Sequence, residues 1–110
     1  MSKYYDNHYA EMKVQPLEVM QEVFDVQEMC NICFSQVIKY HLRAGHKQGE
    51  AYEKDIAKRD RYLSWVEHLI RYETHIDANL EYPLNKEWKE FMLKKIDEKY
   101  KEMLSKKSKD

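Results

Sequence analysis

Residues 26–38 carry apolar side chains on almost every side of a helix, and no other feature limits the fold of this chain as strongly. The apolar residues are Val26, Met29, Cys30, Ile32, Cys33, Phe34, Val37 and Ile38. A helix that is apolar all round has to be covered by neighbouring elements. The chain holds only two glycines and two prolines, too few for the turns of a β-sandwich, so the covering elements should be helices as well. The sequence therefore predicts an all-α fold.

Helix start and stop signals predict four helices in one domain over residues 1–104. Pro16 begins a first helix that ends near Phe24, because a first-turn residue does not need its backbone N–H. Asp25 and Glu28 resemble a capping box for a second helix over residues 26–44. Gly45 stands where that helix is expected to end in a left-handed cap.

The third predicted helix runs from Glu50 to about Leu80, where Tyr82-Pro83 breaks the pattern. Its apolar stripe consists of Ile56, Leu63, Val66, Leu69, Ile70, Ile76 and Leu80. Asn85 can cap a last helix over residues 86–104. We thus divide the domain into an irregular N-terminal arm (residues 1–15), a core (16–80) and a C-terminal helix (85–104), followed by a disordered tail (105–110).

Size and charge restrict the partners that such a domain can have. A 110-residue chain buries a modest share of its surface, so we expect it to form a homo-oligomer. With 19 basic and 20 acidic side chains, we expect it to bind neither duplex DNA nor a membrane. The start of the chain lacks the apolar core of a signal peptide, which predicts a cytoplasmic location and reduced cysteines.

Cationic side chains cluster where the second predicted helix ends and the third begins. Lys39 and Arg43 are four residues apart and share a helix face. The other candidate binding residues are His8, Tyr9, Tyr40, His46, Lys47, Lys54, Arg59 and Tyr62. Cations bind phosphate and aromatic rings stack on bases, so this set predicts a site for a phosphorylated nucleotide. The alternative is a basic helix end that only complements the helix dipole.

Arg59 interrupts the apolar stripe of the third helix. A charged residue on a core-facing stripe must be paired or must line a cavity. We expect Arg59 to lie deep in the nucleotide site. A salt bridge to Asp55, four residues earlier, is the structural alternative.

The residues offer little for catalysis or for metal binding. A phosphate-binding Gly-rich loop with its lysine is missing from the sequence, and no catalytic residue can be assigned. Glu50, Glu53 and Asp55 can hold Mg²⁺ in an enzyme, although carboxylates at this position ordinarily complement a helix dipole. Cys30 and Cys33 are interpreted as apolar packing groups. We therefore expect neither a metal nor a cofactor, and an enzyme only as an alternative.

Several short motifs resemble a family of small phage-encoded helical proteins described as nucleotide kinase-like, after a domain of an early phage nucleotide kinase. The motifs are His8-Tyr9, Gln15-Pro16-Leu17-Glu18-Val19-Met20, Val37-Ile38-Lys39-Tyr40, Leu42-Arg43-Ala44-Gly45, Lys47, Gly49-Glu50, Lys54-Asp55-Ile56, Lys58 and Tyr62-Leu63. They span about residues 8–70. Family members commonly have Gly-Asn where this chain has Ser35-Gln36.

The resemblance implies a phage protein that acts on nucleotides in a bacterial host cell. The chain is also similar in kind to phage proteins that act as sponges for nucleotide immune signals. We expect it to bind and sequester a phosphorylated nucleotide, such as a cyclic or ADP-ribose-type signal, in an anti-defence role. The alternatives are a nucleotide kinase or phosphohydrolase, and a protein–protein inhibitor whose last helix binds a host protein.

Overall fold

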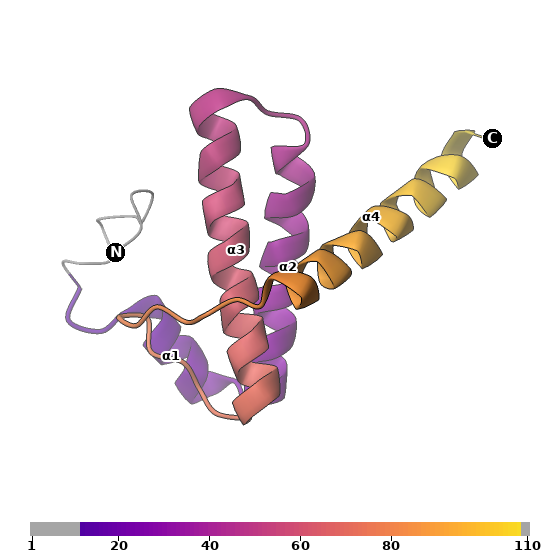
Figure 1. The fold of residues 1–110 in the computed structure, drawn as a ribbon. Coiled ribbons are helices and arrows are strands. Elements are labelled where there is room, and N and C mark those ends of the chain that lie inside the picture. The colour runs from indigo at the N-terminus through magenta and orange to yellow at the C-terminus, as the bar shows by residue number, and fades with distance from the viewer. Residues whose placement is uncertain (1–11, 109–110) are drawn as a thin grey trace.

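An antiparallel pair of long helices forms the centre of the molecule. The computed structural model describes residues 12–108, so the expectations for the N-terminal arm, including His8 and Tyr9, fall largely outside it. The helices are α1 (Pro16–Val23), α2 (Val26–Ala44), α3 (Gly49–Tyr72) and α4 (Lys86–Ser108). α2 and α3 pack along their lengths, α1 lies beside the first turns of α2, and α4 projects away from the pair (Figure 1). Throughout residues 12–108 the regular elements are helices, which confirms the all-α prediction.

The core lies mainly between α2 and α3. Met29, Cys33 and Val37 repeat every four residues along α2 and are fully or almost fully buried. Leu63, Val66 and Leu69 repeat every three residues along α3 and meet them. These spacings place each set on one helix face, so the two faces can pack against each other.

Two of the predicted helix caps are confirmed. Asp25 Oδ1 accepts from the Glu28 N–H at 2.8 Å, and Glu28 Oε1 accepts from the Asp25 N–H at 3.0 Å. Asn85 Oδ1 accepts from the backbone N–H of Trp88 at 2.9 Å. Each cap satisfies a backbone donor that the helix itself leaves without a partner.

The predicted left-handed cap at Gly45 is wrong. Gly45 has φ −62° and ψ −16°, which is right-handed, and the left-handed residue of the connection between α2 and α3 is Gly49 with φ +61°. The helical turn continues past Ala44, because the N–H groups of His46 and Lys47 bond to carbonyls three residues earlier. The chain reverses at Gly49, where a residue without Cβ adopts a positive φ at little cost.

α3 ends at Tyr72, eight residues before the predicted end at Leu80. The chain leaves the helix at Glu73, which has a left-handed φ of 52°. Gln21 then holds Ile76 outside the helix: its Oε1 accepts from the Ile76 N–H and its Nε2 donates to the Ile76 carbonyl, both at 2.7 Å. These bonds replace the helical partners of Ile76. Asp77 then forms a turn in which its Oδ1 accepts from the Asn79 N–H at 2.8 Å. Ile76 is still buried, as the stripe predicts, but it reaches the core from an extended segment.

α4 is longer than predicted. It runs to Ser108, so the predicted disordered tail is wrong for residues 105–108, and residues 109–110 lie outside the described part. Lys106 pairs with Glu102 one turn earlier, and lysines in the last turn interact favourably with the helix dipole. Among the described helices, none has both the length and the apolar content needed to cross a membrane.

Candidate functional site

Three cations surround the ring of Tyr40 near the end of α2. The Lys39 Nζ lies 4.7 Å from the ring centroid, the Lys58 Nζ 5.4 Å and the Arg43 Cζ 5.5 Å. Lys39, Tyr40 and Arg43 come from one turn of α2, whereas Lys58 comes from α3. We refer to these four residues, together with Tyr62, as the Tyr40 cluster. Cation–π attraction of this kind holds the three positive groups close together on the surface.

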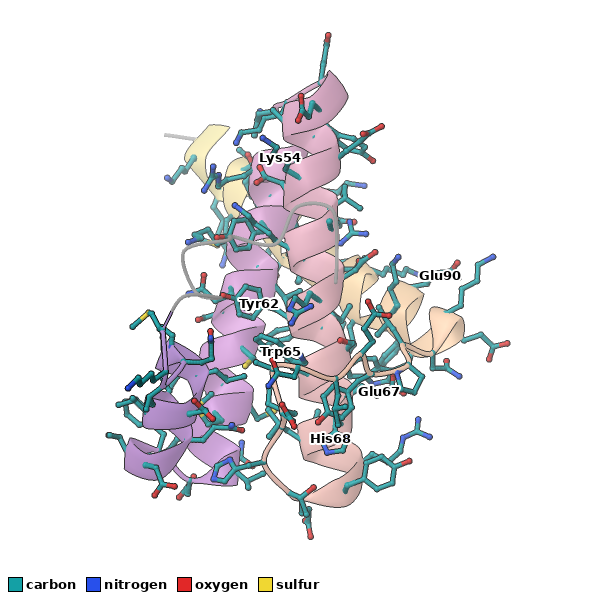
Figure 2. The ribbon with its side chains drawn as sticks, turned by 90° about the vertical axis from the view of Figure 1, so that its left-hand side faces the viewer. Lys54, Tyr62, Trp65, Glu67, His68 and Glu90 are labelled. Carbon is teal, nitrogen blue, oxygen red and sulfur yellow. The ribbon has the colours of Figure 1, made fainter. Side chains whose placement is uncertain are left out.

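The ring of Tyr40 also begins a short row of aromatic side chains. Tyr40 and Tyr62 are almost parallel, with an interplanar angle of 8° and ring centroids 6.0 Å apart. The Tyr62 ring then meets Trp65 edge-on at 5.2 Å, one turn further along α3 (Figure 2). The row leads from the surface cations to the buried Trp65, so the cluster rests on a rigid aromatic base.

A buried carboxylate holds Arg43 of the cluster and adds one further cation, Lys47, beside it. Asp55 is almost completely buried, and its Oδ2 lies 3.0 Å from Lys47 Nζ and 3.7 Å from Arg43 Nε. A buried carboxylate needs such partners, because an unpaired charge in the interior is strongly unfavourable. Asp55 therefore orients Lys47 and Arg43 but neutralises only one of their two charges.

Two predicted site residues lie apart from this arrangement: Lys54 in the first turns of α3 and His46 in the loop after α2. Lys54 pairs with Glu50 one turn earlier at 3.5 Å, and its side chain is half exposed (Figure 2). His46 is exposed in the turn after α2, where its backbone N–H bonds to the Arg43 carbonyl. The structure thus brings together Lys39, Tyr40, Arg43, Lys47 and Tyr62 from the predicted set.

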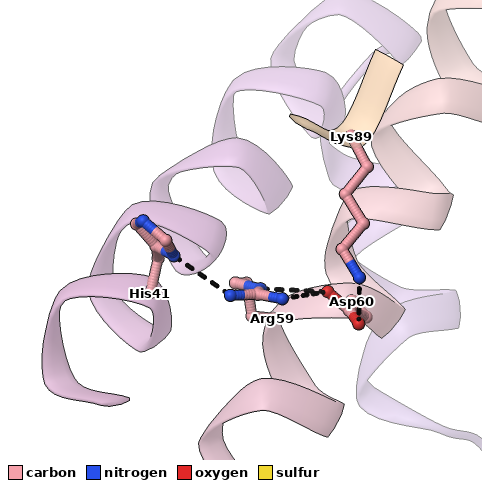
Figure 3. A network of polar contacts seen from close by, with 4 residues as sticks. All are labelled: His41, Arg59, Asp60 and Lys89. Atoms are coloured by element: carbon pink, nitrogen blue, oxygen red, sulfur yellow. Dashed lines mark hydrogen bonds and ion pairs between the residues drawn. The ribbon is translucent and has the colours of Figure 1, made fainter. Parts of the chain in front are cut away.

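Arg59 belongs to a different network, which connects three helices. Its Nε and Nη2 each lie 2.9 Å from Asp60 Oδ1, and its Nη1 donates to His41 Nδ1 at 3.1 Å. Asp60 Oδ2 in turn binds Lys89 Nζ of α4 at 2.9 Å (Figure 3). The structural alternative, a salt bridge between Arg59 and Asp55, is wrong, because Asp55 is held by Lys47 and Arg43.

His41 extends this network to a second point on α4. Its Nε2 lies 2.8 Å from Asp97 Oδ1, while its Nδ1 faces the guanidinium of Arg59. Nδ1 can accept from Arg59 only without a proton, so the proton of the neutral ring is on Nε2 and is donated to Asp97. The His41 ring therefore joins α2, α3 and α4 in one chain of polar contacts.

Sequence reasoning missed several of these residues for a clear reason. Asp60, Lys89 and Asp97 look like ordinary solvent-exposed charges on their own helices, and only the packing of α4 brings them to Arg59 and His41. Lys58 carried a better signal, because it lies one turn after Lys54 on α3. Its contact with Tyr40 depends on how α2 and α3 pair.

The carboxylates proposed for Mg²⁺ do not form a group. Asp55 is held by two cations and Glu50 pairs with Lys54. Within residues 12–108, no three side chains of the metal-ligating types gather at one point.

Cys33 is buried in the core, as the sequence predicts, and we expect it to be unreactive in the native protein. Burial, and secondly the neighbouring Cys30, raise the pKa of Cys33 from its ordinary value of 9.0 to about 12. Near neutral pH almost no thiolate is present, so a disulfide reagent should label at most one thiol before unfolding and both afterwards. Equal labelling rates for Cys30 and Cys33 in the native protein would contradict this.

The native Cys33 thiol keeps its proton to higher pH than the unfolded one. The free energy of unfolding should therefore fall as the pH rises from about 9 toward 12, because the thiol then ionises only in the unfolded chain.

A pocket of about 420 Å³ lies on another part of the molecule, between α3, the segment 73–85 and the start of α4. Arg61, Trp65, Tyr82, Lys86 and Lys89 are among its lining residues. The Arg61 guanidinium lies over the Trp65 ring and donates to the Ala78 carbonyl, which ties the segment 73–85 to α3.

The family of the chain follows from residues 3–64, just over half of its length. A model of a family of proteins of unknown function, DUF3310, matches residues 3–64. The chain belongs to the DUF3310 family. The DUF3310 segment includes α1, α2 and α3 as far as Ser64, so it contains the Tyr40 cluster and Asp55. The segment 73–85 and α4 lie outside it.

Relatives of this DUF3310 protein come from phages. The protein named nucleotide kinase gp1.7 of Escherichia phage T7 is 42% identical over 55 residues, which are 49% of this chain and 28% of the T7 protein. The SaV protein of Lactococcus phage SK1 is 41% identical over 51 residues, 46% of this chain and 40% of SaV. The SaV protein of Lactococcus phage p2 is 37% identical over 54 residues, with coverage of 49% and 40%. The match thus spans less than half of each relative, and no solved structure matches the chain.

Proposed function

We propose that this DUF3310 protein binds a phosphorylated nucleotide at the Tyr40 cluster and sequesters it in the cytoplasm of a phage-infected bacterium. The observation that carries the proposal is the convergence of Lys39, Arg43 and Lys58 on one aromatic ring. Phosphate oxygens would bind these cations, and Tyr40 or Tyr62 would supply a face for the base.

The charges around Tyr40 support an anionic ligand. Lys39 and Lys58 form no ion pair with any residue in the range 12–108, so their charges remain available. Arg43 and Lys47 share a single carboxylate, that of Asp55. A ligand with two or more negative charges would complete the neutralisation of the cluster. The name of the T7 relative also supports a nucleotide.

Sequestration needs affinity without chemistry, and this is what the residues near Tyr40 best supply. Of the carboxylates named for Mg²⁺, Asp55 and Glu50 are paired with cations, which favours retention of the ligand over its conversion. A protein of this kind would withhold a cyclic or ADP-ribose-type signal from host defence proteins.

Recovery of the ligand tests the proposal directly. The protein is incubated with Mg²⁺ and, separately, with a nucleoside monophosphate, a nucleoside triphosphate, a cyclic dinucleotide and ADP-ribose, then heat-denatured, and the released compounds are identified. A sequestering protein retains at least one of them during gel filtration and releases it unchanged. Retention of none would overturn the proposal, and release of a converted compound would replace sequestration by catalysis.

Replacing Arg43 by alanine should weaken binding of the retained nucleotide. A charge-assisted hydrogen bond to phosphate contributes about 1.5–3 kcal/mol, so we expect a loss of roughly 10- to 150-fold in affinity. Titration calorimetry measures this, and circular dichroism checks that the helices remain. Lys94→Ala is the matched control, because Lys94 is an exposed cation on α4 that pairs with Glu98. Equal affinities of Arg43→Ala and Lys94→Ala would remove Arg43 from the site.

An enzyme is the second candidate, and the name of the T7 relative favours it. In that case the protein would act as a nucleotide kinase or phosphohydrolase, and the ligand-recovery experiment would yield a phosphorylated or hydrolysed product. Because Asp55 and Glu50 are paired with cations, Mg²⁺ would then have to arrive mainly bound to the substrate phosphates.

A further inference from the structure

The two halves of α4 have different surroundings. In the first half Leu93 and Ile96 are buried against the body of the protein, and Asp97 bonds to His41. From Asp97 to Lys107 every side chain is exposed. The second half of α4 therefore extends away from the α2–α3 pair (Figure 1).

The apolar face of α4 continues into this exposed half. Tyr100 and Met103 follow Ile96 at spacings of four and three, so they lie on the face that Leu93 and Ile96 bury. Tyr100 is 37% exposed and Met103 is 52% exposed. A helical stretch of about 12 residues is marginal in water by itself, and the pairs that Lys99 and Lys106 form with Glu102 add only a few tenths of a kcal/mol. An apolar face on such a stretch indicates a binding partner.

The outer face of α1 has complementary properties. Val19 and Val23 are one turn apart and are 52% and 67% exposed, while Leu17 on the opposite face packs into the core. Glu18 and Glu22 lie beside the two valines, and α1 contains no basic residue. The outer face of α1 is thus apolar and acidic.

We propose that the exposed half of α4 binds the outer face of α1 in a second copy of this chain. Residues 94–107 contain six lysines and three acidic residues, so the lysines around Tyr100 and Met103 can face Glu18 and Glu22 while the apolar side chains meet the valines. Pairing of α4 with another α4 would instead place lysines opposite lysines. A chain cannot make this contact with itself, because its α1 and the end of its α4 lie on opposite sides of the molecule (Figure 1). The contact therefore joins different copies, and it either closes reciprocally in a two-fold dimer or builds a larger ring or an open chain.

Two variants with complementary defects test the proposal. Val19→Gln with Val23→Gln removes the apolar face of α1, and Tyr100→Gln with Met103→Gln removes that of α4. Glutamine is polar, uncharged and compatible with a helix. In sedimentation experiments on the full chain we expect the wild-type protein to associate, and each variant to raise the dissociation constant by about 100-fold. An equimolar mixture of the two variants keeps one intact contact, and should form a heterodimer of twice the 13.5 kDa chain mass.

Each other outcome would overturn the proposal. A wild-type protein that remains monomeric has another partner for α4, such as a host protein. A variant of Val19 and Val23 that assembles like the wild type shows that α4 does not use α1. A mixture that stays monomeric excludes the contact between α4 and α1. Phe91→Gln is the control, because Phe91 is 55% exposed on the other face of α4 and should assemble normally. Circular dichroism confirms that every variant keeps its helices.

Discussion

Replacement of Leu63 by alanine is expected to lower the free energy of unfolding by about 2–5 kcal/mol. Leu63 is completely buried between α2 and α3, among the apolar side chains that form the core. The substitution removes buried methyl groups and leaves a cavity, because the packed helices relax only partly around it. Urea unfolding followed by circular dichroism measures the loss, which is a large fraction of the stability of a typical small domain.

Ile70→Ala is the matched control for this prediction. Ile70 lies two turns after Leu63 on α3, and the sequence places both in one apolar stripe, yet Ile70 is 55% exposed. Its replacement should change the free energy of unfolding by no more than about 0.5 kcal/mol. Similar losses for Leu63→Ala and Ile70→Ala would mean that α3 is rotated relative to the arrangement described here.

Replacement of Arg59 by alanine is expected to lower the free energy of unfolding by about 1.5–3 kcal/mol. The guanidinium is buried and bonds to Asp60 and to His41, so its removal leaves the Nδ1 of His41 without its donor. It also weakens the attachment of α4, which depends partly on Lys89 and Asp97. Urea unfolding again provides the measurement, with gel filtration to detect expansion of the chain.

Lys54→Ala distinguishes this structural contribution from a contribution to binding. Lys54 is a cation of the same helix, but it forms only an exposed pair with Glu50, so its removal should cost less than about 1 kcal/mol. We expect folded Arg59→Ala to bind nucleotide with nearly the affinity of the wild type. Normal stability of Arg59→Ala combined with lost nucleotide binding would instead assign Arg59 to the binding site.

Local signals in the sequence were sufficient for much of the fold. The start of α2 follows from the Asp25 capping box and from the apolar run that begins at Val26, and the start of α4 follows from Asn85. The end of α3 depends on a side chain 55 residues earlier, because Gln21 competes for the backbone of Ile76. No property of residues 73–80 alone reveals this competition. The conformation of Gly45 was missed because a glycine after a helix fits both a cap and a continued turn.

The candidate site shows the same division between local and distant information. Lys39, Tyr40 and Arg43 lie within one turn, so helical spacing alone brings them together. Lys58 and Tyr62 join them only because α2 and α3 pair in a particular register. Asp55 and Arg59 are separated by one turn and are both buried, yet they serve different networks. Charge and spacing could not assign their partners, because both residues have several oppositely charged neighbours along the chain.

The paired bonds between Gln21 and Ile76 set a tolerance for changes in chain length. A residue inserted between Tyr72 and Ile76 would move another peptide group opposite the glutamine amide and withdraw the isoleucine from the interior. A residue inserted at the exposed positions 79–81 would leave both glutamine bonds in place, but it would lengthen the turn that Asp77 and Tyr82 close. The length of the connection to α4 is therefore fixed before position 76 by a side chain of α1, and after it by the contacts that α4 itself makes with α2 and α3.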